Sequence, residues 1–359
     1  MVTQQRDRAT RFFQLGTRNT AAMAKAIGCI SGGLDSTLAV RLIQRLGIEV
    51  VGLHILHLWA PPPATPDSKP RAIRAAETLG IRCVAIDAAE ADLELVQHPK
   101  HGLGKRMNPC IDCRIWSLHR ARELMIAEEA DFVFTGEVLG QRPMSQRRPM
   151  MDLIERESGL KGRLLRPLSA KCFSPTEVEE RGIVDRSQLL GIAGRSRKVQ
   201  MATAAEWGIT EYPSPAGGCL VTDPGFAFRL RDMLSRGKPT VTDVELLKVG
   251  RHFRLADGTW LVMGRTESDC LLLGPRFQPG DVRIEAENLP GPTTLLRGTA
   301  SEDNIRTAAA LTLRYIKKAG TDARPVLVKA VGGESHTILL AAASEAEARR
   351  WIIAPPEGK

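Results

Sequence analysis

The stretch ISGGLDST, residues 30–37, gives the first indication of the fold of this chain. It follows AKAIGCI (24–30), an apolar run typical of a buried strand. It leads into TLAVRLIQRLG (37–47), where the apolar spacing is helical and a glycine ends the pattern. A glycine loop between a strand and a helix presents backbone N–H groups to an anion, and the helix dipole adds to the attraction. The segment therefore predicts a phosphate-binding turn.

The alternation of strand and helix continues along the first half of the chain. Apolar runs predict further strands at 48–55, 81–87 and 131–136, with helices at 68–80 and from about Cys113 to Ala130. Such alternation predicts an α/β fold with a doubly wound parallel sheet. Right-handed crossovers then bring the loops that follow the strands to one edge of the sheet.

From Ser235 onward the pattern changes. RHFRLADGTWLVMGR (251–265) predicts a hairpin that turns at Asp257 and Gly258, and residues 300–320 predict a capped helix. This pattern indicates a smaller α+β domain at the C-terminal end. The sequence thus predicts three parts: an N-terminal tail (1–20), a nucleotide-binding domain (21–236) and the α+β domain (237–359).

Composition narrows the class of protein. The 359 residues contain no apolar run of the roughly 18 residues that a membrane span needs, so we expect a cytoplasmic protein with no membrane partner. The formal net charge of +9 favours an anionic partner such as nucleic acid. The 7 cysteines are an odd number, which argues against a disulfide framework and favours metal or sulfur chemistry.

The glycine loop fits one nucleotide motif better than two others. The dinucleotide fingerprint needs three spaced glycines, and the Walker loop needs a lysine that is absent here. SGGLDS (31–36) instead resembles the PP-loop of the ATP pyrophosphatase superfamily, whose fold is the adenine nucleotide alpha-hydrolase-like α/β sheet. That resemblance implies that ATP binds with Mg²⁺, and that Asp35 lies near the magnesium ion or the reacting phosphate. The residues implied to bind the nucleotide are Ser31, Gly32, Gly33, Leu34, Asp35, Ser36, Thr37, His54, Gly136 and Gln141.

Three cysteines stand out as candidate ligands. NPCIDCR places Cys110 and Cys113 in a Cys-x-x-Cys pair, and Cys219 follows two glycines that allow close approach of a bulky group. Three thiolates could hold a [4Fe–4S] cluster whose fourth iron lacks a protein ligand. Two alternatives stay open: a redox pair at Cys110 and Cys113, or a zinc ion with a histidine as fourth ligand. The candidate histidines for that fourth position are His98, His101 and His119.

The cysteine spacing resembles that of the cluster-dependent tRNA thiolases, in which such a trio holds the cluster beside the ATP site. The segments TGEVLGQRPMSQ (135–146) and LLRPLSA (164–170) are similar to parts of tRNA 4-thiouridine synthetase. The chain shows neither the RNA-binding domains nor the rhodanese domain of that synthetase, so we expect delivery through the cluster. The resemblance implies that Glu137 and Gln146 also line the site and that Arg166 meets phosphate. Lys105, Arg166 or Lys171 would steady the charge on the activated oxygen.

The segment VGRHFRLADGTWLVMGRTESDCLLLG (249–274) is similar to the NFACT-R type of RNA-associated domain. Basic residues on its hairpin and on the following helix would contact phosphates, which position RNA without reading its sequence. The helix pair Arg314 and Lys318 is spaced to share one face. The full set of candidate phosphate contacts is Arg251, His252, Arg254, Arg265, Arg306, Arg314, Lys317 and Lys318.

Together these features predict an ATP-dependent tRNA sulfurtransferase, with Asp35, Cys110, Cys113 and Cys219 as its catalytic residues. The expected partners are tRNA and either sulfide or a sulfur donor protein, with a homodimer as a further candidate assembly. Three alternatives stay open. They are an amidoligase or small-molecule sulfur-insertion enzyme of the same superfamily, an enzyme of the reverse desulfidation chemistry, and a non-catalytic RNA-binding protein.

Overall fold

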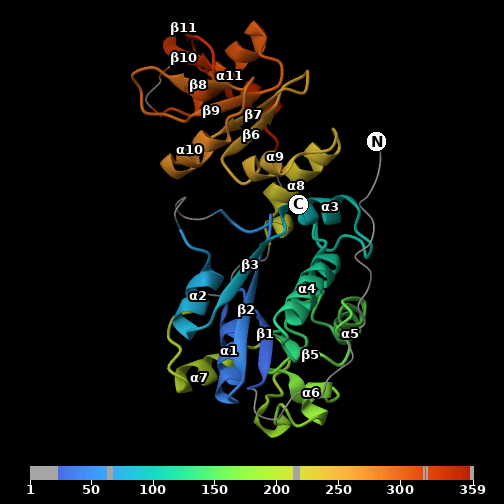
Figure 1. Cartoon of the computed structure of the whole chain (residues 1–359). Helices are drawn as coiled ribbons and strands as arrows, with labels where there is room; N and C mark the ends of the chain where they lie inside the picture. Colours follow the sequence, from blue (N-terminus) through green and yellow to red (C-terminus); the bar gives the residue numbers. More distant parts are fainter. Residues whose placement is uncertain (1–22, 63–67, 213–218, 318–319, 321, 356–359) are drawn as a thin grey trace, which may run out of the picture.

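The computed structural model describes residues 23–62, 68–212, 219–317, 320 and 322–355. It contains two sheets, one in the lower and one in the upper part of Figure 1. The first sheet has five parallel strands in the order β3-β2-β1-β4-β5. These strands are β1 (Lys25–Cys29), β2 (Glu49–Leu56), β3 (Cys83–Asp87), β4 (Phe132–Thr135) and β5 (Leu164–Leu165).

Helices cover both faces of this sheet, because side chains alternate between its faces along each strand. Ala26 packs with α1, α2 and α7 on one face, whereas its neighbour Ile27 packs with α4 and α5 on the other. The fold class predicted from the sequence is therefore confirmed. The helices of this part are α1 (Leu34–Arg45), α2 (Arg71–Leu79), α3 (Ala89–Gln97), α4 (Cys110–Ala127), α5 (Arg148–Glu157), α6 (Glu177–Glu180) and α7 (Lys198–Glu206), with short 3₁₀ turns η1 (Ala170–Cys172) and η2 (Arg186–Gln188).

The second sheet has six antiparallel strands in the order β11-β10-β8-β9-β7-β6. The predicted hairpin is confirmed as β6 and β7, with the turn made by Gly258 at a φ of 90°. The strands are β6 (Arg251–Arg254), β7 (Trp260–Met263), β8 (Val282–Ala286), β9 (Thr294–Arg297), β10 (Arg324–Ala330) and β11 (Ser335–Leu340). The accompanying helices are α8 (Pro224–Leu234), α9 (Val241–Leu246), α10 (Glu267–Leu273), α11 (Glu302–Arg314) and α12 (Glu345–Trp351), with 3₁₀ turns η3 (Leu220–Thr222) and η4 (Gly274–Arg276).

One hydrophobic cluster joins the two parts. Trp59, which follows β2, is 1% exposed and meets Phe226 of α8 edge to face, with ring centroids 6.3 Å apart. The same cluster includes Leu93 of α3 and Trp260 and Val262 of β7. The junction is thus a packed core and not a flexible linker. Within the described ranges, no helix combines the length and apolarity needed to cross a lipid bilayer.

Alanine substitutions of two phenylalanines on α8 test this junction. Phe226 is 1% exposed inside the shared cluster, whereas Phe228 on the same helix is 37% exposed. We expect Phe226→Ala to lower the free energy of unfolding by about 3–5 kcal/mol, because it leaves a cavity. Phe228→Ala should cost less than about 1 kcal/mol. Urea unfolding followed by tryptophan fluorescence measures both, and equal costs would contradict the packed junction.

Candidate functional site

The predicted phosphate loop lies between β1 and α1, and its side chains hold the turn. The Ser36 hydroxyl donates to the carbonyl of Gly33 at 2.9 Å and lies 3.2 Å from the Ser31 hydroxyl. Thr37 Oγ1 donates to the same Gly33 carbonyl at 3.1 Å. Leu34 begins α1 and is buried, so it anchors the turn to the core. The backbone of the loop therefore lies at the N-terminus of α1, where the helix dipole and free N–H groups stabilise an anion.

Two glycines of the predicted site are required by close packing. Gly32 has a φ of 73°, and a Cβ there would lie 2.6 Å from the backbone of Arg71. Gly136, directly after β4, would place a Cβ 2.6 Å from the backbone of Asp35 and Ser36. The loop after β4 therefore lies directly against the phosphate loop.

Asp35 is held by a chain of amides. Its Oδ2 accepts a 2.7 Å hydrogen bond from Gln141 Nε2, and Gln200 Nε2 donates to Gln141 Oε1 at 3.2 Å. Among the described residues, nothing donates to the buried Asp35 Oδ1. A buried carboxylate oxygen that lacks a donor suits a cation ligand, so Asp35 fits the Mg²⁺ that accompanies ATP.

His54 lies on β2 beside the loop. Its Nδ1 is 3.1 Å from the carbonyl oxygen of Ile30, the residue before Ser31. Burial lowers the pKa of His54, so its ring is neutral at pH 7. The ring therefore supports the strand end behind the loop without adding charge.

The three predicted cysteines come together at the carboxyl edge of the parallel sheet. The helix α4 begins at Cys110, three residues earlier than expected, so Cys110 and Cys113 both lie in its first turn. Cys219 directly precedes η3. Two backbone hydrogen bonds fix the segment after Cys219: Leu220 N–H donates to the Trp59 carbonyl at 3.0 Å, and Met107 N–H donates to the Val221 carbonyl at 3.2 Å.

The thiols interact electrostatically with one another. Burial raises the pKa of Cys113 well above its ordinary value, and negative charge on Asp92, Cys219 and Cys110 raises it further. Burial and the charge of Cys110 likewise raise the pKa of Cys219. Because metal ligands are thiolates, a bound cation would offset the burial that keeps Cys113 and Cys219 protonated. The donor set fits a thiophilic metal group.

A partly buried ion pair links the thiol helix to the strand beside the loop. Arg114 follows Cys113, and its Nε donates to Glu137 Oε1 at 2.9 Å. Burial would raise the pKa of Glu137, but the guanidinium groups of Arg114 and Arg166 outweigh it and lower the pKa. Arg166 is 4% exposed and donates to Glu155 at 2.7 Å and to the Met151 carbonyl at 3.2 Å. The expected phosphate contact of Arg166 is therefore wrong, because the guanidinium is buried among protein acceptors.

The three histidines proposed as a fourth zinc ligand are not the one that the structure places beside Cys113. His98 is exposed beside Glu94, His101 is held between Asp112 and Glu157, and His119 lies further along α4. The histidine beside the thiols is His57, whose ring nitrogens lie 3.7 and 3.8 Å from Cys113 Sγ. The sequence pointed only to histidines close to Cys110 and Cys113 along the chain, whereas His57 lies 56 residues from Cys113. The available signal in the sequence was the position of His57 just after a strand of the parallel sheet, at the edge where ligands bind.

The remaining predicted residues differ in accessibility. Gln146 is buried, and its backbone carbonyl accepts from Gly140 N–H at 2.7 Å. Lys105 is exposed in the loop before α4, so it is free to approach a ligand. Lys171 donates to the Ser187 carbonyl at 2.9 Å, which engages its ammonium group within the protein.

The predicted phosphate contacts that the structure describes in the C-terminal part divide into residues that are buried or paired within the protein and residues that are exposed. His252 is 2% exposed and accepts from Trp260 Nε1 at 3.2 Å, so its expected contact with RNA is wrong. Arg254 pairs with Asp232 at 2.9 Å, Arg251 lies over the Tyr315 ring, and Arg314 reaches Glu345 at 3.5 Å. Lys318 lies outside the described residues. The exposed members of the set are Arg265, Arg306 and Lys317.

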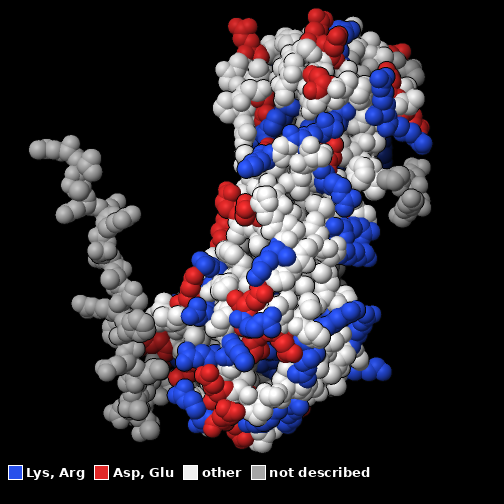
Figure 2. All heavy atoms as spheres, turned by 90° about the vertical axis from the view of Figure 1, so that its right-hand side faces the viewer, with Lys and Arg blue, Asp and Glu red and all other residues white. Residues whose placement is uncertain are grey.

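Figure 2 shows how surface charge is distributed on one side of the molecule. Lysines and arginines follow one edge from the upper to the lower part, whereas acidic and basic side chains mix over the lower part. A run of basic side chains that crosses both parts is typical of a surface that meets a polyanion.

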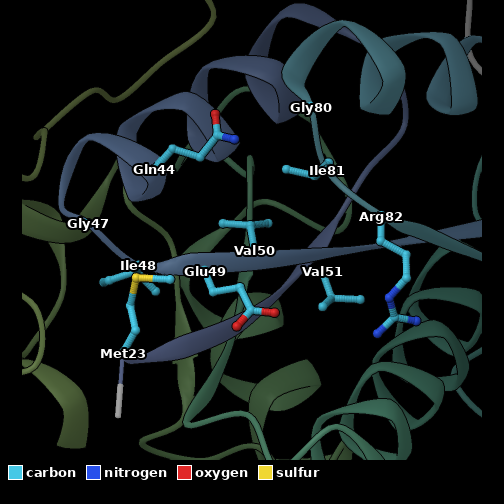
Figure 3. A pocket seen from close by; sticks show the side chains of 10 residues that line it. All are labelled: Met23, Gln44, Gly47, Ile48, Glu49, Val50, Val51, Gly80, Ile81 and Arg82. Atoms are coloured by element: carbon cyan, nitrogen blue, oxygen red, sulfur yellow. The ribbon is translucent and has the colours of Figure 1, made fainter. Parts of the chain in front are cut away.

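The cavity in Figure 3, of about 460 Å³, lies away from this chemistry. Its lining comes from the end of α1, the start of β2 and the Gly80–Arg82 turn, including Gln44 and Glu49. These residues lie at the amino ends of the strands, opposite the edge that carries the loop and the thiols. The cavity is therefore not the nucleotide site.

Comparison with known proteins agrees with this arrangement. Residues 250–352 match the family described as the NFACT protein RNA binding domain. The tRNA-specific 2-thiouridylase MnmA of Thermus thermophilus is 31% identical over 137 residues, which cover 32% of this chain and 36% of that protein. The N-terminal part resembles PP-loop tRNA thiolases. The predicted resemblance is thereby confirmed, although the chain spans only about a third of the curated relatives it matches.

Two solved structures are similar at a lower level. A 4-thiouridine synthetase–RNA complex with bound ATP is 18% identical, with a TM-score of 0.33, over 63% of this chain and 52% of that one. The U34-tRNA thiolase NcsA of Methanococcus maripaludis with its [4Fe–4S] cluster is 17% identical, with a TM-score of 0.30, over 63% and 72%. At these scores the structural likeness supports no conclusion by itself.

Cys29, at the end of β1, gives a prediction about pH. Burial raises the pKa of its thiol from the ordinary 9.0 to about 11. The folded state then holds this proton more tightly than the unfolded state does. The protonated thiol therefore adds to the free energy of unfolding in full below pH 9, and this stabilisation is lost as pH rises toward 11. Two pKa units correspond to on the order of 2–3 kcal/mol.

Urea unfolding at pH 8.5, 10 and 11 should therefore show a steeper loss of stability for the reduced wild type than for Cys29→Ala. Cys172→Ala serves as a control, because Cys172 lies outside the core of the sheet. Parallel pH profiles for wild type and Cys29→Ala would contradict the raised pKa.

Proposed function

We propose that the protein is an ATP-dependent tRNA sulfurtransferase, which adenylates a nucleobase carbonyl and replaces its oxygen with sulfur. The observation that supports this most is the ion pair of Arg114 and Glu137. It joins the helix that begins with Cys110 and Cys113 to the loop after β4, which lies against the phosphate loop. A phosphate loop alone suits many ATP enzymes. Thiols grouped beside it suit sulfur transfer specifically.

In the proposed first step, the nucleobase oxygen attacks the α-phosphorus of ATP and pyrophosphate leaves. Backbone N–H groups at the start of α1 would hold the phosphates, with Ser36 and Thr37 fixing the turn through the Gly33 carbonyl. Asp35, oriented by Gln141, would hold Mg²⁺ through its free Oδ1. The step converts a carbonyl oxygen, a poor leaving group, into part of AMP.

In the proposed second step, a sulfur nucleophile attacks the activated carbon and AMP leaves with the original oxygen. Cys110, Cys113 and Cys219 would hold a [4Fe–4S] cluster, which when bound supplies an iron that activates sulfide. Lys105, exposed beside the thiol helix, would steady the charge on the activated oxygen. The partly buried pair of Arg114 and Glu137 would keep the thiols in a fixed position relative to the loop.

The C-terminal part supplies the proposed RNA contact. We assign residues 21–236 to the ATP pyrophosphatase domain and 237–359 to RNA binding, following the family match at 250–352. Arg265, Arg306 and Lys317 are exposed there and would contact tRNA phosphates. The 2-thiouridylase similarity makes a uridine the preferred target.

Serine substitutions test the ATP step. Ser36→Ala removes a hydroxyl that donates to a carbonyl in the loop, and Ser158→Ala removes a comparable bond to the Glu155 carbonyl far from it. Because the loop must be preorganised for charge that develops on phosphate, we expect AMP formation to fall about 10²–10³-fold in Ser36→Ala. Ser158→Ala should retain it. Equal rates in both variants would refute the assignment of this loop.

Anaerobic purification tests the sulfur step. We expect roughly four irons and matching acid-labile sulfide per chain, both lost in a Cys110→Ala, Cys113→Ala, Cys219→Ala variant. A Cys83→Ala, Cys172→Ala, Cys270→Ala variant is the matched control. With ATP, Mg²⁺, sulfide and unmodified tRNA, nucleoside mass spectrometry should find a thiolated uridine for wild type and the control only.

The outcomes separate the alternatives. AMP formation that needs tRNA but never yields thionucleoside would favour a different nucleophile, as in an amidoligase. A protein that binds tRNA yet hydrolyses no ATP would be a binding protein, and the proposal would be wrong.

A further inference from the structure

Gln200 is a glutamine of α7 that is 0% exposed. Its Nε2 donates to Gln141 Oε1 at 3.2 Å. Its own Oε1 is also buried, and no donor in the described part of the chain reaches it. An unpaired buried acceptor lowers stability, so in a native protein such a residue calls for an explanation beyond packing. The hydrogen bond to Gln141 supplies one, because Gln141 is in turn bonded to Asp35.

The orientation of each amide in this chain follows from the carboxylate at its end. An ionised carboxylate only accepts hydrogen bonds, so the group of Gln141 that lies 2.7 Å from Asp35 Oδ2 is its NH₂ group. The Gln141 oxygen therefore faces away from Asp35 and needs a donor, which the NH₂ group of Gln200 supplies. Turning the Gln141 amide around would set two acceptors against each other at Asp35. Gln200 thus fixes which end of the Gln141 amide meets the carboxylate.

The surrounding backbone holds these side chains in one packed unit. The loop after β4 is bonded to the segment before α7, because Gly194 N–H donates to the Leu139 carbonyl at 2.7 Å. The helix α7 also shares a hydrophobic cluster with α1, the helix that carries Asp35, and this cluster includes Ala204 of α7 and Leu38 of α1. A displacement of the Gln200 amide relative to Asp35 would therefore disturb a packed core.

We propose that Gln200 is a positioning residue of the nucleotide site. By donating to Gln141 it keeps the Gln141 NH₂ group on Asp35 Oδ2, which leaves the buried Asp35 Oδ1 free for the divalent cation that accompanies ATP. Gln200 acts through these two residues and touches neither ATP nor the cation. The inference rests on the proposed function, because it needs Asp35 to bind that cation.

Binding of α,β-methylene-ATP, an analogue that cannot transfer AMP, tests this role in the full-length protein. Calorimetry gives its dissociation constant with excess Mg²⁺ and with EDTA, and the ratio of the two constants is the gain in affinity from the cation. Gln200→Met keeps the length of the side chain but has no N–H donor. We expect it to lower this gain about 10-fold, as the loss of a group that orients a metal ligand does, and to leave binding in EDTA unchanged.

Gln44→Met is a matched control. Gln44 also donates one hydrogen bond, to the Leu79 carbonyl at 2.9 Å, and its Oε1 is likewise buried without a donor among the described residues. It lines the cavity at the amino ends of the strands, away from the phosphate loop (Figure 3). This control should match wild type with Mg²⁺ and with EDTA.

Asp35→Asn should remove the gain from Mg²⁺, and adding Gln200→Met to it should cause no further loss, because Gln200 acts through Asp35. A wild-type gain in Gln200→Met would overturn the positioning role, and so would an equal loss of binding with Mg²⁺ and with EDTA. If circular dichroism shows Gln200→Met to be unfolded, Gln200→Glu replaces it, because an ionised carboxylate cannot donate to Gln141 either. Wild type that binds the analogue no better with Mg²⁺ than with EDTA would instead refute the assignment of Asp35, and with it the ATP step of the proposed function.

Discussion

A partly buried ion pair between Arg114 and Glu137 holds the two halves of the site together. Arg114 belongs to the helix that begins with Cys110 and Cys113, and Glu137 follows the strand that ends against the phosphate loop. The Glu137 side chain is 8% exposed and also faces Arg166 and Thr135, so the carboxylate is held from several sides. The ion pair therefore ties the start of the thiol helix to the end of β4.

The same strand end requires a glycine at position 136. The residue lies between β4 and Glu137, directly against the backbone of Asp35 and Ser36. Only a residue without a side chain allows the two loops to approach this closely. Carboxylate, phosphate loop and thiol helix thus meet at one strand end, as expected where ligands bind at the carboxyl edge of a parallel sheet.

The same edge is joined to the C-terminal part by a continuous core. Trp59 contributes its ring to the cluster around Phe226, while its carbonyl holds the segment after Cys219. His57 lies two residues before it, beside Cys113. Packing at the junction and the position of the third thiol therefore depend on one short segment.

Local sequence patterns were enough to predict the parallel α/β class, the phosphate loop, the C-terminal hairpin and the three cysteines, because these depend on period, glycine and spacing. The same reasoning missed His57 and Asp92, and it assigned Arg166 and His252 to anions although both are buried. Local sequence patterns do not show which distant side chains lie together at one edge of the sheet. The three-dimensional arrangement was needed to show that β2, α3 and α4 bring a histidine, a carboxylate and a thiol together, because crossovers and burial fix those distances.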